Sequence, residues 1–397
     1  MADLLQTPSG SRIHIAFLGR RNVGKSSLMN AFTSQEISIV APVAGTTTDP
    51  VSKAMELLPL GAVNVIDTAG LDDEGDLGAL RVEKTYDILA KVQIAIVVAD
   101  ATVGLGVWEE KILAFLREKK IPYIIAMNKA DLLDTIPAEE ENTLYLSAKD
   151  GTNVHRLREK TAHLLPQGAV QRPLVSDLVE KGDTVVLVVP IDASAPKGRL
   201  ILPQQMVIRD LLEHEICAVC TKDTTLQDTL SALKEKPALV ITDSQVFGKV
   251  SSIVPEDVPL TSFSILMARY KGSLQQSLLG AETLMTLHDG DKVLISEGCS
   301  HHRQCEDIGT VKIPNLIRKV LGVDPDFTFT SGGTFPKDLG SYRLVIHCGG
   351  CTLTEQEMKS RMTLCRENGT TVTNYGMTLA ALNGILERSM KPLKGKI

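Results

Sequence analysis

The stretch GRRNVGKS, residues 19–26, decides the fold expected for the first part of this 397-residue chain. It follows the apolar run RIHIAFL, which is typical of a buried strand, and it leads into SLMNAF, which is typical of a helix start. A strand, a G-x-x-x-x-G-K-S loop and a helix in this order form the phosphate-binding loop, whose backbone N–H groups surround phosphate oxygens. The stretch therefore predicts a doubly wound α/β domain that binds a nucleoside triphosphate at the carboxyl edge of its sheet.

Side chains from this loop and from a later strand end predict the chemistry at the phosphates. Lys25 places a positive charge near the outer phosphates, and the hydroxyl of Ser26 can hold Mg²⁺. The segment VNVIDTAG ends a predicted strand with Asp67 and Gly70. Asp67 can reach Mg²⁺ through water, and the N–H of Gly70 can contact the γ-phosphate.

Two further segments predict that the base is guanine. YIIAMNKAD ends another predicted strand, and the carboxylate of Asp131 would accept hydrogen bonds from guanine N1 and N2, a donor pair that adenine lacks. LYLSAKDG supplies a loop that can close over the base. Four motifs in this order, each at a strand end, predict a GTPase. The predicted nucleotide-binding residues are Gly19, Asn22, Val23, Gly24, Lys25, Ser26, Ser27, Asn128, Lys129, Asp131, Ser147, Ala148 and Lys149.

The composition is that of a globular protein: 43% of the residues are hydrophobic and 23% are charged. The net charge of −6 argues against a general nucleic-acid binder, which usually carries a basic face. No apolar run approaches the roughly 20 residues of a membrane span, and the first residues lack the layout of a signal peptide. We therefore expect a cytoplasmic protein without a membrane anchor.

The remaining chain predicts two smaller α/β domains. The stretch 164–175 contains two prolines and a glycine and is a plausible linker. Strand-like and helix-like runs alternate after it, which favours parallel sheets. The predicted organisation is a GTPase domain over 1–168, an α/β domain over 174–265 in which no phosphate-binding or acid–base motif is visible, and an α/β domain over 270–397 that contains the candidate metal ligands.

The seven cysteines favour thiol or metal chemistry over a disulfide framework. Cys217 and Cys220 lie three apart on a predicted strand, so their side chains point to opposite faces and cannot bind one ion together. We expect both to be small buried residues. Cys365 falls on the apolar face of a predicted helix, where burial is also expected.

The other candidate ligands follow two predicted strands. Cys299 follows the first, whereas His347, Cys348 and Cys351 follow the second, and parallel strands end at the same edge of a sheet. Three thiolates suit either zinc or an iron–sulfur cluster. Adjacent side chains diverge in an extended segment, so His347 and Cys348 are awkward partners for one tetrahedral zinc ion. A 4Fe-4S cluster would leave its fourth corner to a replaceable ligand such as His301 or His347.

The first domain resembles the TrmE–Era branch of GTPases in the segments RNVGKSSLMNAF and VAGTTTDP. The resemblance implies that Thr47 closes on Mg²⁺, with Thr46 as the neighbouring alternative. It also implies that Asn22 helps to seat a stimulating K⁺, although an amide that caps the loop is the other interpretation. Leu71 stands where Ras-like enzymes have a water-orienting glutamine, so the expected intrinsic hydrolysis is slow. The predicted catalytic residues are Lys25, Thr47, Asp67 and Gly70.

The whole chain resembles the FeFe-hydrogenase maturation GTPases, the HydF family, which combine such a GTPase domain with the terminal pattern C-x-H…H-C-x-x-C. The resemblance implies a 4Fe-4S cluster on Cys299, Cys348 and Cys351, and dimerisation through the middle domain. It further implies a scaffold that carries a di-iron precursor, built by two radical-SAM maturases, to apo FeFe-hydrogenase. The GTPase would then regulate partner exchange.

A rival interpretation is an RNA- or ribosome-associated TrmE–Era-type GTPase with a structural zinc site in its C-terminal domain. Such a protein should carry a basic tail with exposed aromatic residues. The aromatic content of 4% and the mixed charge around Cys299 argue against it.

Overall fold

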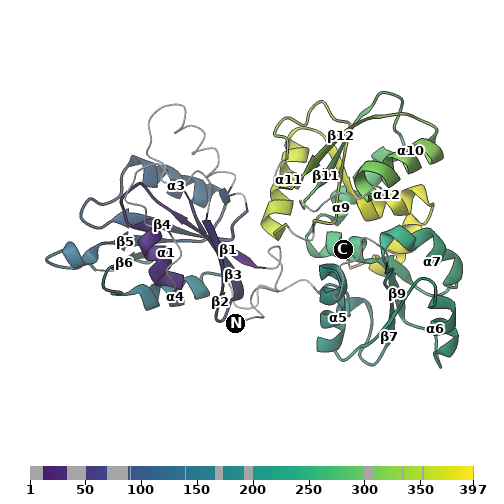
Figure 1. Cartoon of the computed structure of the whole chain (residues 1–397), viewed down its shortest axis with the longest axis horizontal. Helices are drawn as coiled ribbons and strands as arrows, with labels where there is room; N and C mark the ends of the chain where they lie inside the picture. Colours follow the sequence, from purple (N-terminus) through teal and green to yellow (C-terminus); the bar gives the residue numbers. More distant parts are fainter. Residues whose placement is uncertain are drawn as a thin grey trace. The chain divides into compact units, whose positions relative to one another are not determined.

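The computed structural model describes residues 12–33, 51–68, 88–89, 91–138, 140–165, 173–191, 200–298, 307–332, 335–350 and 353–396. The chain divides into two compact units, Met1–Val170 and Gln171–Ile397 (Figure 1). No helix among the described residues is both long enough and apolar enough to cross a membrane.

The first unit is built on a six-stranded sheet in the order β2-β3-β1-β4-β5-β6. Only the pairing of β2 with β3 is antiparallel. The strands are β1 (Ile13–Leu18), β2 (Val51–Leu57), β3 (Gly61–Asp67), β4 (Ile94–Asp100), β5 (Tyr123–Asn128) and β6 (Thr143–Tyr145). Strand β4 is buried along almost its whole length because helices cover both faces of the sheet, which explains its continuous apolar sequence IAIVVA.

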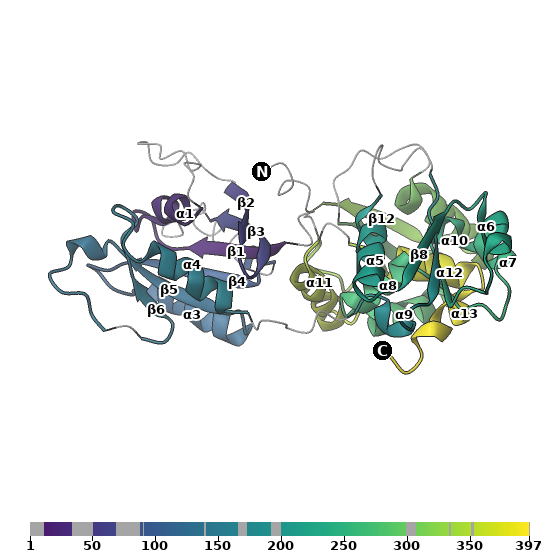
Figure 2. The same ribbon diagram turned by 90° about the horizontal axis from the view of Figure 1, so that it is seen from below.

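Helices lie on both faces of this sheet. Helices α1 (Lys25–Thr33) and α4 (Val154–His163) contribute Phe32 and Leu157 to the core on one face. Helix α3 (Val107–Glu118) contributes Leu116 to the core on the other face. Figure 2 shows α1 and α3 on opposite sides of β1. The predicted doubly wound fold is confirmed, and the carboxyl ends of its parallel strands meet at one edge.

The second unit contains two four-stranded parallel sheets. The first has the order β10-β9-β7-β8 and comprises β7 (Thr184–Val188), β8 (Cys217–Thr221), β9 (Leu239–Thr242) and β10 (Leu260–Ser262). Its helices are α5 (Leu202–Glu213), α6 (Leu226–Ala232), α7 (Phe247–Ile253) and α8 (Phe263–Tyr270). The parallel α/β character predicted for this region is confirmed.

The second sheet has the order β12-β11-β13-β14 and comprises β11 (Lys292–Glu297), β12 (Asp326–Ser331), β13 (Leu344–His347) and β14 (Thr371–Asn374). Its helices are α9 (Leu274–Leu284), α10 (Ile313–Leu321), α11 (Glu355–Glu367), α12 (Tyr375–Leu382) and α13 (Leu386–Met390). Helix α11 packs on one face, whereas α10 and α12 pack on the other (Figure 1). Each face therefore has a core of its own.

The two sheets of the second unit are joined through shared packing. Met377, Met390 and Leu393, which follow the second sheet in the sequence, are buried in the core of the first sheet. Helix α9 approaches β14 closely at Gly280, where a Cβ atom would lie 2.2 Å from the carbonyl oxygen of Val372. The two C-terminal domains predicted from the sequence therefore form one compact unit with two sheets.

Cys217, Cys220 and Cys365, which are not among the predicted metal ligands, have different environments. The predicted burial of Cys217 and Cys220 is wrong, since both side chains are exposed on β8. Among the described strands, β8 lies at the edge of its sheet and pairs with β7 alone, a position that local sequence does not reveal. The predicted burial of Cys365 is confirmed, and burial raises the pKa of its thiol to about 12. Cys365 is therefore a core residue that stays protonated at neutral pH.

Candidate functional site

The phosphate-binding loop connects β1 to α1, and two of its glycines meet steric requirements. Gly24 has a φ of 83°, and a Cβ there would lie 2.3 Å from the side-chain nitrogen of Asn128. A Cβ at Gly19 would lie 2.5 Å from the carbonyl oxygen of Val98. Both positions therefore exclude side chains, and the loop stays close to β4 and β5.

Lys25, Ser26 and Asp67 lie together beside this loop. The Oγ of Ser26 donates to Oδ2 of Asp67 at 2.7 Å, and the Nζ of Lys25 lies 3.6 Å from Oδ1 of Asp67. That Oδ1 atom is buried and has no hydrogen-bond partner in the described structure. A hydrated divalent cation would supply the missing partner, so these residues fit the predicted Mg²⁺.

Asn128 connects the phosphate-binding loop to the loop expected at the base. Its side-chain nitrogen donates to the carbonyl oxygen of Val23 at 2.9 Å, and its side-chain oxygen accepts from the N–H of Ala148 at 2.9 Å. The buried Ser147 accepts from the N–H of Lys149 at 3.3 Å. Asn128 therefore fixes the spacing between two nucleotide-binding segments and has a structural role even without ligand.

The other predicted base-reading residues, Lys129 and Asp131, follow the end of β5. Lys129 adopts a left-handed conformation, with φ of 65°, and its Nζ lies 2.6 Å from Oδ2 of Asp100. Burial would raise the pKa of Asp100, but the hydrogen bonds from Lys129 and Thr102 hold it below its ordinary value. Asp131 is exposed in a turn of 3-10 helix, where its carboxylate can meet a base.

An ion pair that the sequence did not reveal anchors the phosphate-binding loop to α3. The Nε of Arg20 donates to Oε1 of Glu109 at 2.7 Å, and Glu109 is fully buried. The N–H of Gly106 donates to the other carboxylate oxygen at 2.9 Å. Glu109 therefore holds the start of its own helix and the neighbouring loop.

The structure does not test the predicted roles of five further residues of the first unit. Thr46, Thr47, Gly70 and Leu71 lie outside the described residues, so their roles stay predictions. Asn22 has a φ of 64° in the loop, a conformation that asparagine tolerates better than most residues, and its role toward K⁺ also stays a prediction.

The second candidate site lies where β11 and β13 end. Ser296 and His347 are direct neighbours in the register of these parallel strands, and the N–H of Cys348 donates to the carbonyl oxygen of Ser296 at 2.9 Å. The two strand ends from which the predicted ligands follow therefore share one edge of the sheet, as expected.

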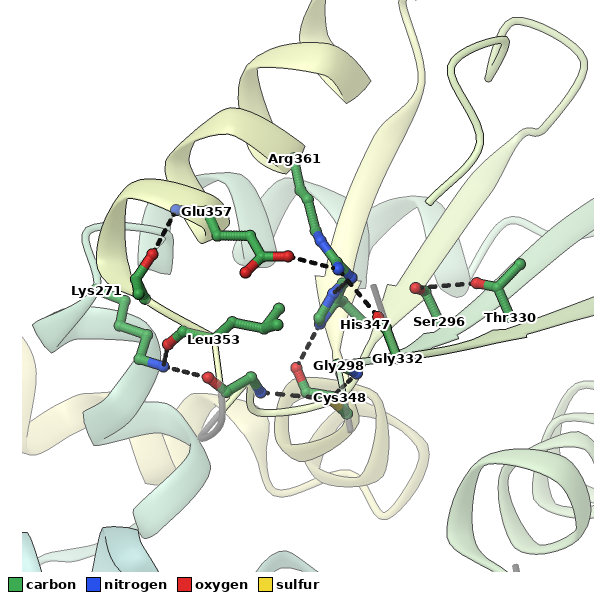
Figure 3. A network of polar contacts seen from close by, with 12 residues as sticks. Lys271, Ser296, Gly298, Thr330, Gly332, His347, Cys348, Leu353, Glu357 and Arg361 are labelled. Carbon is green, nitrogen blue, oxygen red and sulfur yellow. Dashed lines mark hydrogen bonds and ion pairs between the residues drawn. The ribbon is translucent and has the colours of Figure 1, made fainter. Parts of the chain in front are cut away.

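The sulfur of Cys348 accepts hydrogen bonds from two glycines. The N–H of Gly298 lies 3.0 Å from this sulfur, and the N–H of Gly350 lies 3.4 Å from it (Figure 3). Gly298 directly precedes Cys299 in the sequence, and Gly350 directly precedes Cys351. Backbone N–H···S bonds of this kind stabilise thiolates that hold iron–sulfur clusters. The half-buried Cys348 therefore fits a thiolate ligand.

Both glycines have steric reasons to be glycine. Gly350 has a φ of 59°, and a Cβ there would lie 2.7 Å from the sulfur of Met358. A Cβ at Gly298 would lie 2.7 Å from the side chain of Leu353. Cys299, His301 and Cys351 lie outside the described residues. Within the described part of the chain, no group of three or more His, Cys, Asp or Glu side chains could hold a metal ion.

His347 uses both ring nitrogens in contacts with the chain. Its Nε2 lies 2.9 Å from Nη1 of Arg361, and its Nδ1 lies 2.8 Å from the carbonyl oxygen of Cys348 (Figure 3). Arginine only donates, so Nε2 accepts, and Nδ1 carries the hydrogen that it donates to Cys348. The ring lies beside Phe335 on the α11 face, whereas Cys348 packs with the core of the opposite face. If a ring nitrogen of His347 bound a metal, the contact of that nitrogen with Arg361 or with Cys348 would be lost.

Arg361 and Glu357 form a buried ion pair next to His347. Nη2 of Arg361 lies 3.0 Å from Oε1 of Glu357 and donates to the carbonyl oxygen of Gly332 at 3.1 Å. The guanidinium also lies over the ring of Phe335, 5.0 Å from its centroid. Arg361 therefore links α11 to the end of β12 and to His347. We call the sheet edge at Ser296 and His347, where β11 and β13 end, the metal edge, after the ligands predicted to follow it.

Replacing Arg361 with methionine is expected to destabilise the second unit by about 3–5 kcal/mol, because Glu357 would keep a buried charge without its partner. The loss comes from the broken ion pair between Arg361 and the buried Glu357, and chemical denaturation followed by circular dichroism would measure it. The only tryptophan, Trp108, lies in the first unit, so its fluorescence transition should stay unchanged. Lys359→Met on the same helix removes an exposed ion pair and should cost less than about 1 kcal/mol. Equal effects of both variants would contradict this role of Arg361.

Tyr375 adds a buried donor on the other face of the metal edge. Its hydroxyl donates to Oε1 of the buried Glu297 at 3.2 Å. Burial raises the pKa of Tyr375, and the negative charges of Cys348 and Glu297 raise it further. Tyr375 therefore stays protonated. Asn374, the last residue of β14, accepts from the N–H of Met377 and caps the start of α12.

Three family models match the chain. A 50S ribosome-binding GTPase model matches residues 14–129, and a hydrogen maturase F dimerization domain matches residues 174–272. A hydrogen maturase F tetramerization domain matches residues 275–392. The two hydrogen maturase F matches together span more than half of the chain.

Curated relatives match the first unit. The tRNA modification GTPase MnmE of Thiobacillus denitrificans is 35% identical over 150 residues, which are 37% of this chain and 32% of that protein. The MnmE of Laribacter hongkongensis is 36% identical over 154 residues, 37% of this chain and 33% of that protein. The chain thus spans about a third of the length of these relatives.

Among solved structures, Era of Aquifex aeolicus bound to GDP and AlF4⁻ is 21% identical, with a TM-score of 0.35, over 53% of this chain and 92% of that one. The sheet order, the phosphate-binding loop and the MnmE matches all identify the first unit as a GTPase domain similar to those of the TrmE–Era branch. With both of its C-terminal domains matched, the chain belongs to the hydrogen maturase F family, HydF.

Proposed function

We propose that this protein is a GTP-hydrolysing iron–sulfur scaffold that holds a di-iron precursor and delivers it to apo FeFe-hydrogenase. One observation carries the metal part of the proposal: the sulfur of Cys348 accepts N–H groups from the two residues that directly precede Cys299 and Cys351. The matches to both hydrogen maturase F domains support the maturation role.

The proposed cluster ligands are Cys299, Cys348 and Cys351. His301 is the favoured candidate for the fourth corner, because both ring nitrogens of His347 already have chain partners. The bound cluster would offer one exchangeable iron position to the di-iron precursor. The protein's own contribution is to hold the thiolates, donate N–H groups to them and cover them with Tyr375 and α12.

The proposed activity of the first unit is slow, Mg²⁺-dependent and K⁺-stimulated GTP hydrolysis. Lys25, Ser26 and Asp67 support the Mg²⁺ and phosphate roles through their mutual contacts. Thr47, Gly70 and the K⁺ role of Asn22 rest on the sequence resemblance.

The proposed partners are two radical-SAM maturases, the apo-hydrogenase and further copies of this chain, in the cytoplasm. The family models named for dimerization and tetramerization support self-association. Nucleic acid and membranes are not among the proposed partners. The rival RNA-associated GTPase with a zinc site is disfavoured, because residues 275–392 match a hydrogen maturase F domain.

Anaerobic loading with iron and sulfide tests the metal assignment. We expect a brown protein with about four iron and four sulfide per chain and an EPR signal after reduction. The loaded protein should activate apo-hydrogenase after incubation with the two maturases. A colourless protein that retains one tightly bound zinc per chain would overturn the cluster assignment.

A further inference from the structure

Lys271 reaches from the end of α8 to the segment that contains Cys351. It directly follows α8 and is only 4% exposed. Its Nζ donates to the carbonyl oxygens of Gly350 and Leu353, the latter at 3.0 Å (Figure 3). We propose that Lys271 is a positioning residue that holds Gly350 and Leu353 in place and puts a buried positive charge beside the sheet edge at Cys348. This inference rests on the proposed iron–sulfur function.

The contacts of Gly350 connect the ammonium group to the predicted ligands. The N–H of Gly350 donates to the sulfur of Cys348, whereas its carbonyl oxygen accepts from Lys271. The N–H of Leu353 also donates to the carbonyl oxygen of Gly350, at 3.0 Å, so the two residues that accept from Lys271 also contact each other. Lys271 therefore holds the backbone of Gly350 and Leu353, and through the N–H of Gly350 it acts on the sulfur of Cys348.

The charge of Lys271 has an electrostatic consequence. A 4Fe-4S cluster on three thiolates is anionic, and reduction adds one more negative charge. Coulomb interactions are stronger in a protein interior than in water, so a buried ammonium group favours the more negative state. Lys271 should therefore make the cluster easier to reduce. Glu297, on the Tyr375 side of the same edge, acts in the opposite direction.

Lys271 also connects two domains. It belongs to the segment matched by the dimerization domain, whereas Gly350 and Leu353 belong to the segment matched by the tetramerization domain. A cavity of about 10 Å³, lined by residues that include Lys271, Ser273, Cys348 and Asn374, lies at this junction. That volume suits one water molecule between polar groups. The subunit-pairing domain thus supplies a residue to the metal edge of its neighbour.

A reductive titration of the loaded protein, followed by EPR, tests the charge. In Lys271→Met we expect the ratio of reduced to oxidised cluster at a fixed potential to fall about tenfold, which corresponds to about 59 mV for one electron. Lys271→Arg keeps the charge and should remain within twofold of the unchanged protein. Lys319→Met, on the exposed last turn of α10, is the matched control and should have no effect.

The apo protein gives an independent measurement of the positioning role. Alkylation of Cys348 should be several-fold faster in Lys271→Met than in Lys271→Arg, because the segment around Gly350 would lose its anchor. Equal reduction ratios in the Met and Arg variants, or equal alkylation rates if the Met variant cannot be loaded, would overturn the proposal and leave the proposed function intact. A protein with unchanged Lys271 that binds no iron would instead refute the proposed function, whatever the alkylation rates.

Discussion

Replacing Lys25 with alanine is expected to reduce GTP hydrolysis by about 10²–10³-fold or more, because the charge that stabilises the transferring phosphoryl group would be lost. Lys25 is 8% exposed and shares Asp67 with Ser26, so its ammonium group is already positioned at the phosphate edge. Phosphate release measured with Mg²⁺, in K⁺ and in Na⁺, would test this loss and the predicted K⁺ stimulation together.

The same variant should load iron and sulfide as the unchanged protein does, because Lys25 and Cys348 belong to different compact units. Lys111→Ala, an exposed position on α3, is the matched control for removing one lysine and should retain hydrolysis. Simultaneous loss of hydrolysis and iron in Lys25→Ala would contradict the separation of the two sites.

Replacing Cys348 with serine is expected to lower bound iron from about four to less than about one per chain, since a soft thiolate ligand would be lost. The serine hydroxyl could still accept the N–H groups of Gly298 and Gly350, so the local fold should survive. The visible absorption band and the EPR signal should disappear, whereas GTP hydrolysis should remain.

Cys220→Ser is the matched control for this experiment, because Cys220 is exposed on β8 and belongs to the other sheet of the unit. It should bind iron as the unchanged protein does. If Cys348→Ser kept a full iron content and its EPR signal, Cys348 would not be a ligand and the scaffold proposal would fail.

Local sequence was sufficient wherever one segment contained the whole pattern. The run IAIVVA predicts a strand buried on both faces, and the phosphate-binding loop predicts the strand before it and the helix after it, which are β1 and α1. The edge shared by β11 and β13 was predictable too, because parallel strands end on the same side.

Features that depend on distant contacts were not predictable from one sequence. Glu109 meets Arg20 across 89 positions, and Lys271 meets Leu353 across 82. No local pattern identifies such pairs, because the fold alone brings them together. Cys220 was misjudged for the same reason, since burial depends on whether a strand lies inside a sheet or at its edge.

His347 illustrates a different limit. Its place beside Cys348 makes it a candidate metal ligand in the sequence, whereas the structure shows Nε2 in contact with Arg361 and Nδ1 in contact with the carbonyl oxygen of Cys348. The contacts of His347 orient the end of β13, and its role toward a metal stays a prediction.

The burial of Met390 and Leu393 beneath the first sheet of the second unit has a consequence for biosynthesis. A ribosome delivers the strands of that sheet long before it delivers these two side chains, so the sheet must wait for them to complete its core. The contact between Lys271 and Gly350 can likewise form only after the chain has been synthesised well beyond the first sheet. Insertion of the proposed cluster would therefore follow the synthesis of the whole second unit.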